Sequence, residues 1–250
     1  MQPIFNPHLY HGEFAGGIGI DFAFEFEETA QYLEAYLEKD IVVETEEDCV
    51  YVGESEYADW KALGNPSRNA YAEYSLLSCR TSEYLMAYHR VVFHAVAMRW
   101  HDKAWLLTAP PGIGKSTQYK NLHELYPEEV SIISGDRPIL EMREDGSVFV
   151  HPSPWNGKER WFGADGAPLA GIVFLKHGEN AIESITPAQV AGRTYFSCFQ
   201  THESTEILHR VATLTSHLLK AVPLWQLTNR GDYASSELIY EVMRKTEKAL

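Results

Sequence analysis

The chain has 250 residues, a formal net charge of −14 at pH 7, and 45% hydrophobic residues. This length allows one sizeable domain or a small domain joined to a larger one, and the composition is ordinary for a folded protein. A field of this sign repels nucleic acid and anionic membranes, so neither is an expected partner. An anionic ligand such as a nucleotide would need a strong local positive site, which makes the few clustered cations informative.

Cysteine usage and hydropathy favour a cytoplasmic location. No stretch approaches the roughly 18 consecutive apolar residues that a membrane helix needs. The N-terminal residues lack a basic region followed by an apolar run, so we expect no signal peptide. Cys49, Cys79 and Cys198 are far apart and form no CxxC pair. We therefore expect buried or incidental thiols in a reducing compartment.

Residues 1–82 are acidic and aromatic, and they predict a small β-rich N-terminal module. Residues 18–26, "IGIDFAFEF", alternate with the period of a half-buried strand. Residues 28–40 have apolar positions at helical spacing and predict a short helix. Residues 41–53, "IVVETEEDCVYVG", indicate a hairpin with its tip near residues 46–48.

Residues 83–250 predict a nucleotide-binding domain of the α/β class with a mixed sheet, because strands and helices alternate along most of this part. A helix beginning near Tyr84 is expected to give way to a strand that runs to Trp100. "AWLLTA" is a short apolar strand, and residues 116–126 have helical spacing and stop before Pro127. The further expected elements are a strand at 130–134, a hairpin turned by Asp145-Gly146, a strand at 170–176, helices at 187–198 and 204–222, a strand at 223–227, and a terminal helix at 235–250 capped by Ser235 or Ser236.

The segment "APPGIGKST" between that strand and helix resembles a Walker A loop, G-x-x-x-x-G-K-[ST]. Main-chain N–H groups of such a loop converge on phosphate oxygens, and its lysine reaches the terminal phosphates. Ala109 replaces the first glycine, which would cost about 1 kcal/mol only if that position needed a positive φ. The prolines precede the donors that matter. The predicted nucleotide-binding residues are Pro111, Gly112, Ile113, Gly114, Lys115, Ser116 and Thr117.

Two side chains near the loop are candidates for chemistry. Asp136 follows the strand at 130–134, and ligands of open α/β sheets collect beyond the carboxyl ends of strands. It could hold Mg²⁺ together with the Ser116 hydroxyl, or accept a proton from an attacking hydroxyl, or simply form the turn in Gly-Asp-Arg-Pro. His94 lies on the strand that precedes the loop strand, and its setting in "VVFHAVAM" favours a core residue.

The stretch "HPSPWNGKERW", residues 151–161, combines turn formers, cations and tryptophan. One interpretation is an active-site loop in which Lys158 or Arg160 offsets phosphate charge. The other is a solvated exit from the preceding hairpin. Spacing does not separate the two.

The order of these features resembles the HPr kinase/phosphorylase-like family, which shares its nucleotide-binding core with phosphoenolpyruvate carboxykinase. The resemblance rests on "FHAVAMRWHDKAWLLTAPPGIGKS", "SIISGD", "HPSPWNGKE", "GIVFLK" and "VPLWQL", and covers about residues 84–245. It implies the mixed-sheet core of that family and places a histidine such as His94 beside the phosphates. Family members are oligomers, so a homo-oligomer is one open alternative.

The chain departs from the family at the strand end after the loop helix. Family members have two adjacent acids there, one acting as base toward a serine, whereas this chain has Gly135 and Asp136. Asp136 alone could cover both duties, Glu159 or His94 could assist, or transfer could be impaired. The later signature for HPr docking and phosphorylase activity is not evident, which indicates a divergent member.

The resemblance and the loop together predict a kinase that uses ATP, or GTP, with Mg²⁺. Its acceptor is expected to be a hydroxyl, namely serine of a peptide, a protein or the free amino acid. The alternatives are a nucleotide-binding regulatory module of weak activity and an ATPase. The predicted catalytic residues are Asp136, His94 and Lys115, with Ser116 and Asp136 as Mg²⁺ ligands and with Arg137, Lys158 and Arg160 as contacts to phosphate or substrate.

Overall fold

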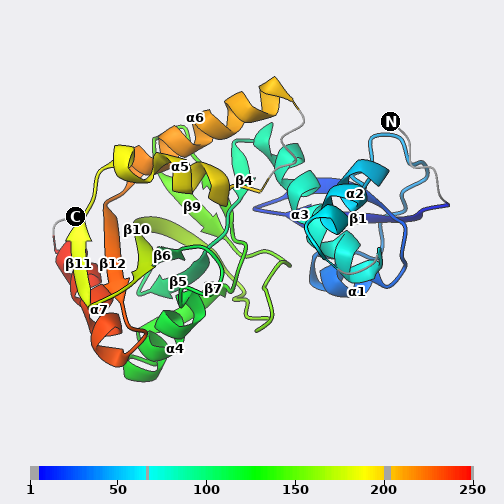
Figure 1. Cartoon of the computed structure of the whole chain (residues 1–250). Helices are drawn as coiled ribbons and strands as arrows, with labels where there is room; N and C mark the ends of the chain where they lie inside the picture. Colours follow the sequence, from blue (N-terminus) through cyan, green and yellow to red (C-terminus); the bar gives the residue numbers. More distant parts are fainter. Residues whose placement is uncertain (1–5, 66–67, 200–203, 249–250) are drawn as a thin grey trace.

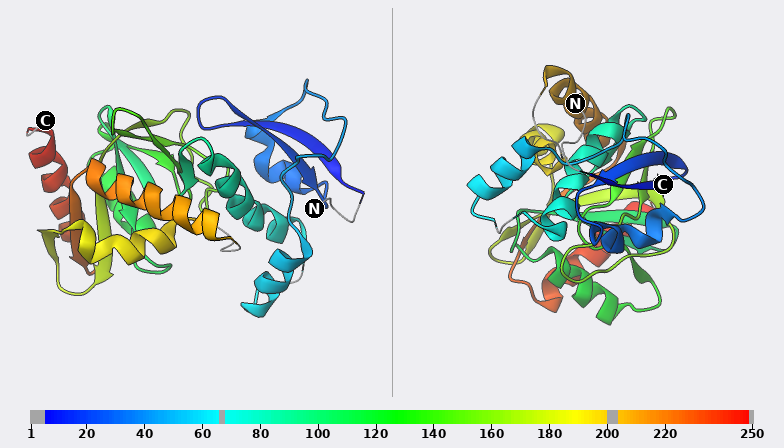
Figure 2. Two further views of the ribbon diagram at one scale, coloured as in Figure 1. Left: turned by 90° about the horizontal axis from the view of Figure 1, so that it is seen from above. Right: turned by 90° about the vertical axis from the view of Figure 1, so that its right-hand side faces the viewer.

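The computed structural model describes residues 6–65, 68–199 and 204–248. Within these residues the chain forms a nine-stranded mixed sheet and a separate three-stranded antiparallel sheet. Figure 1 shows the two sheets at opposite sides of the molecule, with α3 (Ala70–Met86) between them. The view from above in Figure 2 shows the same order. The fold is therefore mixed α/β, as the sequence predicts.

The central strand of the large sheet is β10 (Ala167–His177), whose residues are almost all buried. It runs parallel to β6 (Lys103–Thr108) on one side and to β12 (Leu224–Asn229) on the other. Beyond β6, β5 (Val96–Trp100) pairs antiparallel with β6 and β7 (Val130–Ser134). The remaining strands of this sheet are β4 (Arg90–Val92), β8 (Ile139–Met142), β9 (Val148–His151) and β11 (Ala181–Ser184).

Helices cover both faces of this sheet (Figure 1). One hydrophobic cluster joins the sheet to α5 (Pro187–Ser197) and α6 (Thr205–Ala221). A second cluster joins the opposite face to α4 (Lys115–Leu125) and α7 (Tyr233–Glu247). Neighbouring residues on one strand enter different clusters, because successive side chains of a strand point to opposite faces. This packing holds the carboxyl end of β6 beside the start of α4.

The small sheet has the order β2-β1-β3 and belongs to the N-terminal part. Its aromatic face forms a third cluster with α3, Val92, Ile139 and Trp155, so the small sheet and the large one share a core through α3. α3 also runs across residue 82, where the sequence places a domain boundary, and that division stays a prediction. The elements of this part are β1 (His8–Phe14), β2 (Ile18–Phe24), α1 (Thr29–Leu33), a 3₁₀ turn (Glu34–Tyr36), β3 (Leu37–Glu38) and α2 (Glu54–Ala62).

Two predictions for the N-terminal part are wrong. The helix expected at residues 28–40 is only the short α1, followed by the 3₁₀ turn and β3. The hairpin expected at residues 41–53 is not formed, and of those residues only Val50 makes an isolated bridge, to Phe22. Val42 is 81% exposed, so the apolar start of this segment has no sheet to cover it. Four acids in residues 44–48 favour solvent over strand pairing.

Two local predictions for the larger part also need correction. The strand expected to run through His94 is interrupted between β4 and β5, and His94 lies in the break. The cap of α7 is Asp232, whose side chain accepts a hydrogen bond from the Ser235 N–H, while Ser235 and Ser236 are buried inside the helix. Asp and Ser are comparable N-cap residues, so sequence alone could not choose between them. Among the described helices, none combines the length and hydropathy needed to cross a bilayer.

Candidate functional site

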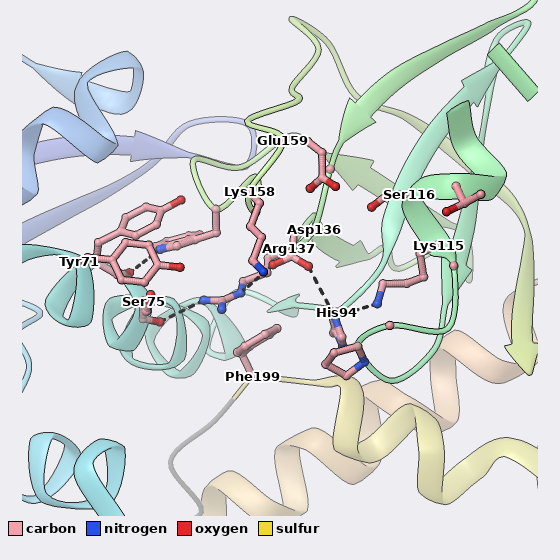
Figure 3. Close-up of a pocket in the computed structure, with 18 residues that line it drawn as sticks. Tyr71, Ser75, His94, Lys115, Ser116, Asp136, Arg137, Lys158, Glu159 and Phe199 are labelled. Atoms are coloured by element: carbon pink, nitrogen blue, oxygen red, sulfur yellow. Dashed lines mark hydrogen bonds and ion pairs between the residues drawn. The ribbon is translucent and has the colours of Figure 1, made fainter. Parts of the chain in front are cut away.

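A cleft of about 650 Å³ lies at the carboxyl end of β6 and β7. Its lining comes from the start of α4, residues 135–137, residues 155–159, α3 and Phe199. Figure 3 shows the charged side chains of these segments gathered around Asp136. The cleft thus collects groups from five separate parts of the chain, including the loop and the acidic turn singled out from the sequence.

The glycine-rich loop connects the buried strand β6 to α4 as the sequence predicts. Gly112 and Gly114 have φ of +84° and +102°, which a residue with a side chain adopts only with strain. Gly114 is the N-cap of α4 and has no side chain to cap the helix, so the first N–H groups of α4 keep their capacity to bind an anion. Ala109 has no positive φ, so replacement of the first glycine carries no backbone penalty.

Lys115 begins α4 and folds back over the loop. Its side chain is buried at 8% exposure, and its Nζ donates to the Ala109 carbonyl at 2.9 Å and lies 3.0 Å from His94 Nε2. Burial lowers the pKa of Lys115, and the nearby carboxylates of Asp136 and Glu159 oppose that shift. The ammonium is therefore a partly desolvated cation that an incoming phosphate would stabilise.

His94 stands between Lys115 and Asp136. Its Nε2 is also 3.5 Å from Asp136 Oδ1, which makes one ring nitrogen common to a cation and an anion. A charged Lys115 can only donate, so Nε2 accepts from it when His94 is neutral, and it can donate to Asp136 only with a proton of its own. The two contacts are therefore alternatives. The backbone fixes the ring here, because His94 N–H donates to Ser197 O and His94 O accepts from the Thr108 hydroxyl.

Asp136 follows β7 and is ionised in this setting. Burial raises the pKa of Asp136, but a hydrogen bond from His94 and the charges of Arg137, His94 and Lys115 outweigh it and hold the pKa below its usual value. Arg137 is in turn fixed on α3, since its Nη1 donates to Ser75 O at 3.1 Å and to Ser78 Oγ at 2.8 Å. The carboxylate is thus held in place by a residue that spans the two parts of the molecule.

The structure gives a physical reason for the glycine before Asp136. A Cβ at Gly135 would lie 2.9 Å from Asn156 O and 3.1 Å from Trp161 O. The Gly135 N–H also donates to Trp161 O at 2.8 Å, so this approach is part of the backbone pairing. A second acid at residue 135 would need the backbone of residues 156–161 to move away.

The remaining predicted residues divide between the cleft and its surroundings. Lys158 lines the cleft, as does Glu159. Ile113 packs against the cluster under α4 instead, and Arg160 is exposed, has φ of 53° and does not line the cleft. Their predicted roles remain predictions. The sequence interpretation did not find four lining residues, Tyr71, Tyr74, Ser75 and Phe199, and no motif in the sequence marks them.

The cleft offers oxygen ligands of the kind that Mg²⁺ prefers. Ser116 on the first turn of α4 and Asp136 both line it, and they supply a hydroxyl and a carboxylate. Within the described ranges, no three His, Cys, Asp or Glu side chains gather as a metal cage. Two protein oxygens suffice for an ion that keeps its waters and binds substrate phosphates, so the residues present fit Mg²⁺.

Comparison with known proteins gives a distant match. The sequence matches no protein-family model and no curated protein. Among solved structures, the Hpr(Ser) kinase/phosphatase from Coxiella burnetii is similar to 63% of this chain, over 97% of its own, at 10% sequence identity and a TM-score of 0.36. This is a distant structural relationship that assigns no residue a role, so the function proposed below depends on the geometry of the cleft.

Proposed function

We propose that the chain is a Mg²⁺-dependent phosphotransferase that moves the γ-phosphoryl group of ATP, or GTP, to a hydroxyl acceptor, serine of a peptide, a protein or the free amino acid. The observation that carries the proposal is the contact of Lys115 with His94 at 3.0 Å and of His94 with Asp136 at 3.5 Å, next to an uncapped helix start. This places a cation for the terminal phosphates and a carboxylate for the acceptor at opposite ends of one imidazole.

The proposed reaction needs positioning and charge neutralisation more than covalent chemistry. Main-chain N–H groups of residues 112–117 and the Lys115 ammonium bind the β- and γ-phosphates. Asp136 hydrogen-bonds to the acceptor hydroxyl and directs its oxygen at the γ-phosphorus. Because its pKa is low, Asp136 is a weak base, which suits a loose transition state in which the hydroxyl proton leaves late. Mg²⁺, bound through Ser116 and Asp136, would neutralise charge on the phosphates.

A second candidate is a nucleotide-binding regulatory module or an ATPase. It is favoured by Gly135, where the close approach of Asn156 O and Trp161 O leaves no room for a second acid. A site with one carboxylate could bind a nucleotide, or hydrolyse it, without transferring phosphate to a hydroxyl acceptor.

Transfer of label from γ-labelled ATP separates these functions. The protein is incubated with Mg²⁺ and serine-containing peptides, or free serine, and compared with Lys115→Ala and Asp136→Asn. A phosphotransferase labels the acceptor, and both variants lose that label. Phosphate release without an acceptor identifies the ATPase. Binding without turnover, unchanged in Asp136→Asn, identifies the regulatory module.

A further inference from the structure

The cleft has a second half on the far side of Asp136 from the glycine-rich loop. This inference rests on the proposed function. If Lys115 binds the terminal phosphates, the γ-phosphorus faces His94 and Asp136, with which Lys115 is grouped. The rest of the nucleotide then extends along the loop, away from Asp136. The space between Asp136 and α3, lined by Tyr71, Tyr74 and Phe199, remains for the acceptor.

An aromatic wall, defined as Tyr71, Tyr74, Trp155 and Phe199, closes this half of the cleft. Most of it is fixed in position. The Tyr74 hydroxyl donates to Pro154 O at 2.8 Å, and Trp155 Nε1 donates to Tyr74 O at 2.8 Å. Phe199 lies under the Arg137 guanidinium, 4.4 Å from ring centroid to Cζ. A rigid wall of this kind binds a ligand with little loss of conformational entropy.

Two cations face this half beside one carboxylate. Asp136 Oδ2 is already 3.3 Å from Arg137 Nε, so it is paired with that cation. Lys158 projects into the same space in Figure 3, and it forms no ion pair or hydrogen bond with any residue that the structure describes. A second positive charge beside Arg137 is unfavourable without a counter-ion. In a chain of net charge −14, an uncompensated lysine in a cleft indicates an anionic ligand.

We propose that the acceptor carries a carboxylate next to its hydroxyl, which Lys158 binds beside Arg137 while the aromatic wall contacts the apolar part of the molecule. The hydroxyl oxygen forms a bond to the γ-phosphorus, and the bond from that phosphorus to the β,γ-bridging oxygen breaks with its electron pair. The hydroxyl proton passes to Asp136 and then to solvent. The products are the nucleoside diphosphate and a phosphomonoester that keeps its carboxylate.

The test compares acceptors that differ only in this charge. L-Serine is matched with L-serinamide, and a Ser-Asp peptide with amide ends is matched with the Ser-Asn peptide. The first pair asks whether the carboxylate belongs to a free amino acid, and the second whether it belongs to a peptide side chain. Each is assayed with wild type, with Lys158→Met, and with Lys245→Met on the exposed face of α7 as the control.

We expect the charged member of one pair to exceed its neutral partner in kcat/KM by about tenfold to a hundredfold, as for a partly desolvated ion pair. Lys158→Met removes that preference, leaves the neutral acceptor within about twofold, and leaves the KM for nucleotide unchanged, so the pattern is a double difference that misfolding does not produce. Lys245→Met behaves as wild type. Calorimetry of L-serine and the Ser-Asp peptide, with Mg²⁺ and a non-hydrolysable ATP analogue, is expected to show binding that Lys158→Met weakens by a similar factor.

Three results overturn the acceptor proposal. Equal losses for charged and neutral acceptors with a raised nucleotide KM would assign Lys158 to the nucleotide phosphates. Equal use of charged and neutral acceptors by wild type would remove the need for a carboxylate. Nucleotide binding without binding or labelling of any charged probe would overturn the acceptor class while leaving the nucleotide site. Failure to bind nucleotide at all is a different outcome, and it overturns the proposed function itself.

Discussion

At one end of the cleft the groups that face the ligand come from one short segment, residues 109–117, whereas at the other end they come from α3, residues 155–158 and Phe199. The loop end relies on main-chain N–H groups and a single buried lysine. The wall end relies on side chains that hydrogen bonds and ring contacts fix in place.

This difference separates what each end can vary. Main-chain donors stay in place when side chains change, so the loop end suits a constant ligand such as a triphosphate. A wall of side chains can change one residue at a time, so it suits a ligand that differs between related proteins. Substitutions at the two ends should therefore change different kinetic parameters.

The largest effect is expected at the loop end. Lys115→Met removes the charge that stabilises the terminal phosphates, and kcat/KM for phosphoryl transfer should fall by about 10²- to 10³-fold, as when one donor is lost from a pre-organised anion site. Lys120→Met on the same helix is the matched control, because Lys120 is exposed and its Nζ lies over the Trp161 ring. Steady-state kinetics on both variants measure this. Equal activities would remove Lys115 from the site.

Gly135→Asp tests whether a second acid fits beside Asp136. The new Cβ would meet Asn156 O at 2.9 Å, so we expect a loss of about 1–3 kcal/mol in the free energy of unfolding. Tm in thermal unfolding should fall by about 5 °C. Gly192→Asp makes the same change on α5, where a Cβ meets nothing within 4 Å, and should leave Tm within about 1 °C. A stable and more active Gly135→Asp variant would contradict this account of the glycine.

The low pKa of Asp136 predicts how stability depends on pH. Ionised Asp136 stabilises the folded state above its unfolded pKa, near 3.8, and this contribution disappears as the pH falls through the lower folded value. The difference in the free energy of unfolding between wild type and Asp136→Asn should be constant above about pH 5 and shrink below about pH 4. Urea denaturation between pH 3 and 7 measures it. A difference that grows on acidification would mean that the carboxyl pKa is raised instead.

The smallest expected effect is a fraction of one proton. Burial lowers the pKa of Lys115 in the free protein, and a bound phosphate raises it again, so nucleotide binding should take up a proton at alkaline pH. Calorimetry in buffers of different ionisation enthalpy measures this uptake. Lys115→Arg should abolish the uptake, because arginine stays protonated throughout. Uptake that persists in this variant would come from another group.

Short-range sequence signals predicted the loop end well. An apolar strand, two glycines at positions of positive φ and an amphipathic helix follow one another within a few residues, and each feature is local. Asp136 was placed near the loop because β7 ends there, and the structure brings the two into one cleft. The hairpin expected at 41–53 failed for the opposite reason, since strand pairing depends on a partner that local alternation does not reveal.

The wall end could not be derived in this way. Trp155 and Tyr74 are 81 positions apart in the chain, and they meet through a hydrogen bond to a main-chain carbonyl, which leaves no mark on the sequence. Phe199 reaches the cleft because its N–H pairs with Val92 O. The Pro-Trp segment was recognised as a candidate, but its role as the support for α3 became visible only from the packing.

Titration calorimetry with Mg²⁺ and a non-hydrolysable ATP or GTP analogue tests the central claim most directly, namely that residues 112–117 and Lys115 bind a nucleoside triphosphate. The account predicts saturable heat at one site per chain for wild type and Asp136→Asn, and a loss of at least tenfold in affinity for Lys115→Ala, as when the charged partner of a phosphate is removed. No heat with either nucleotide, or equal affinity of wild type and Lys115→Ala, would contradict it.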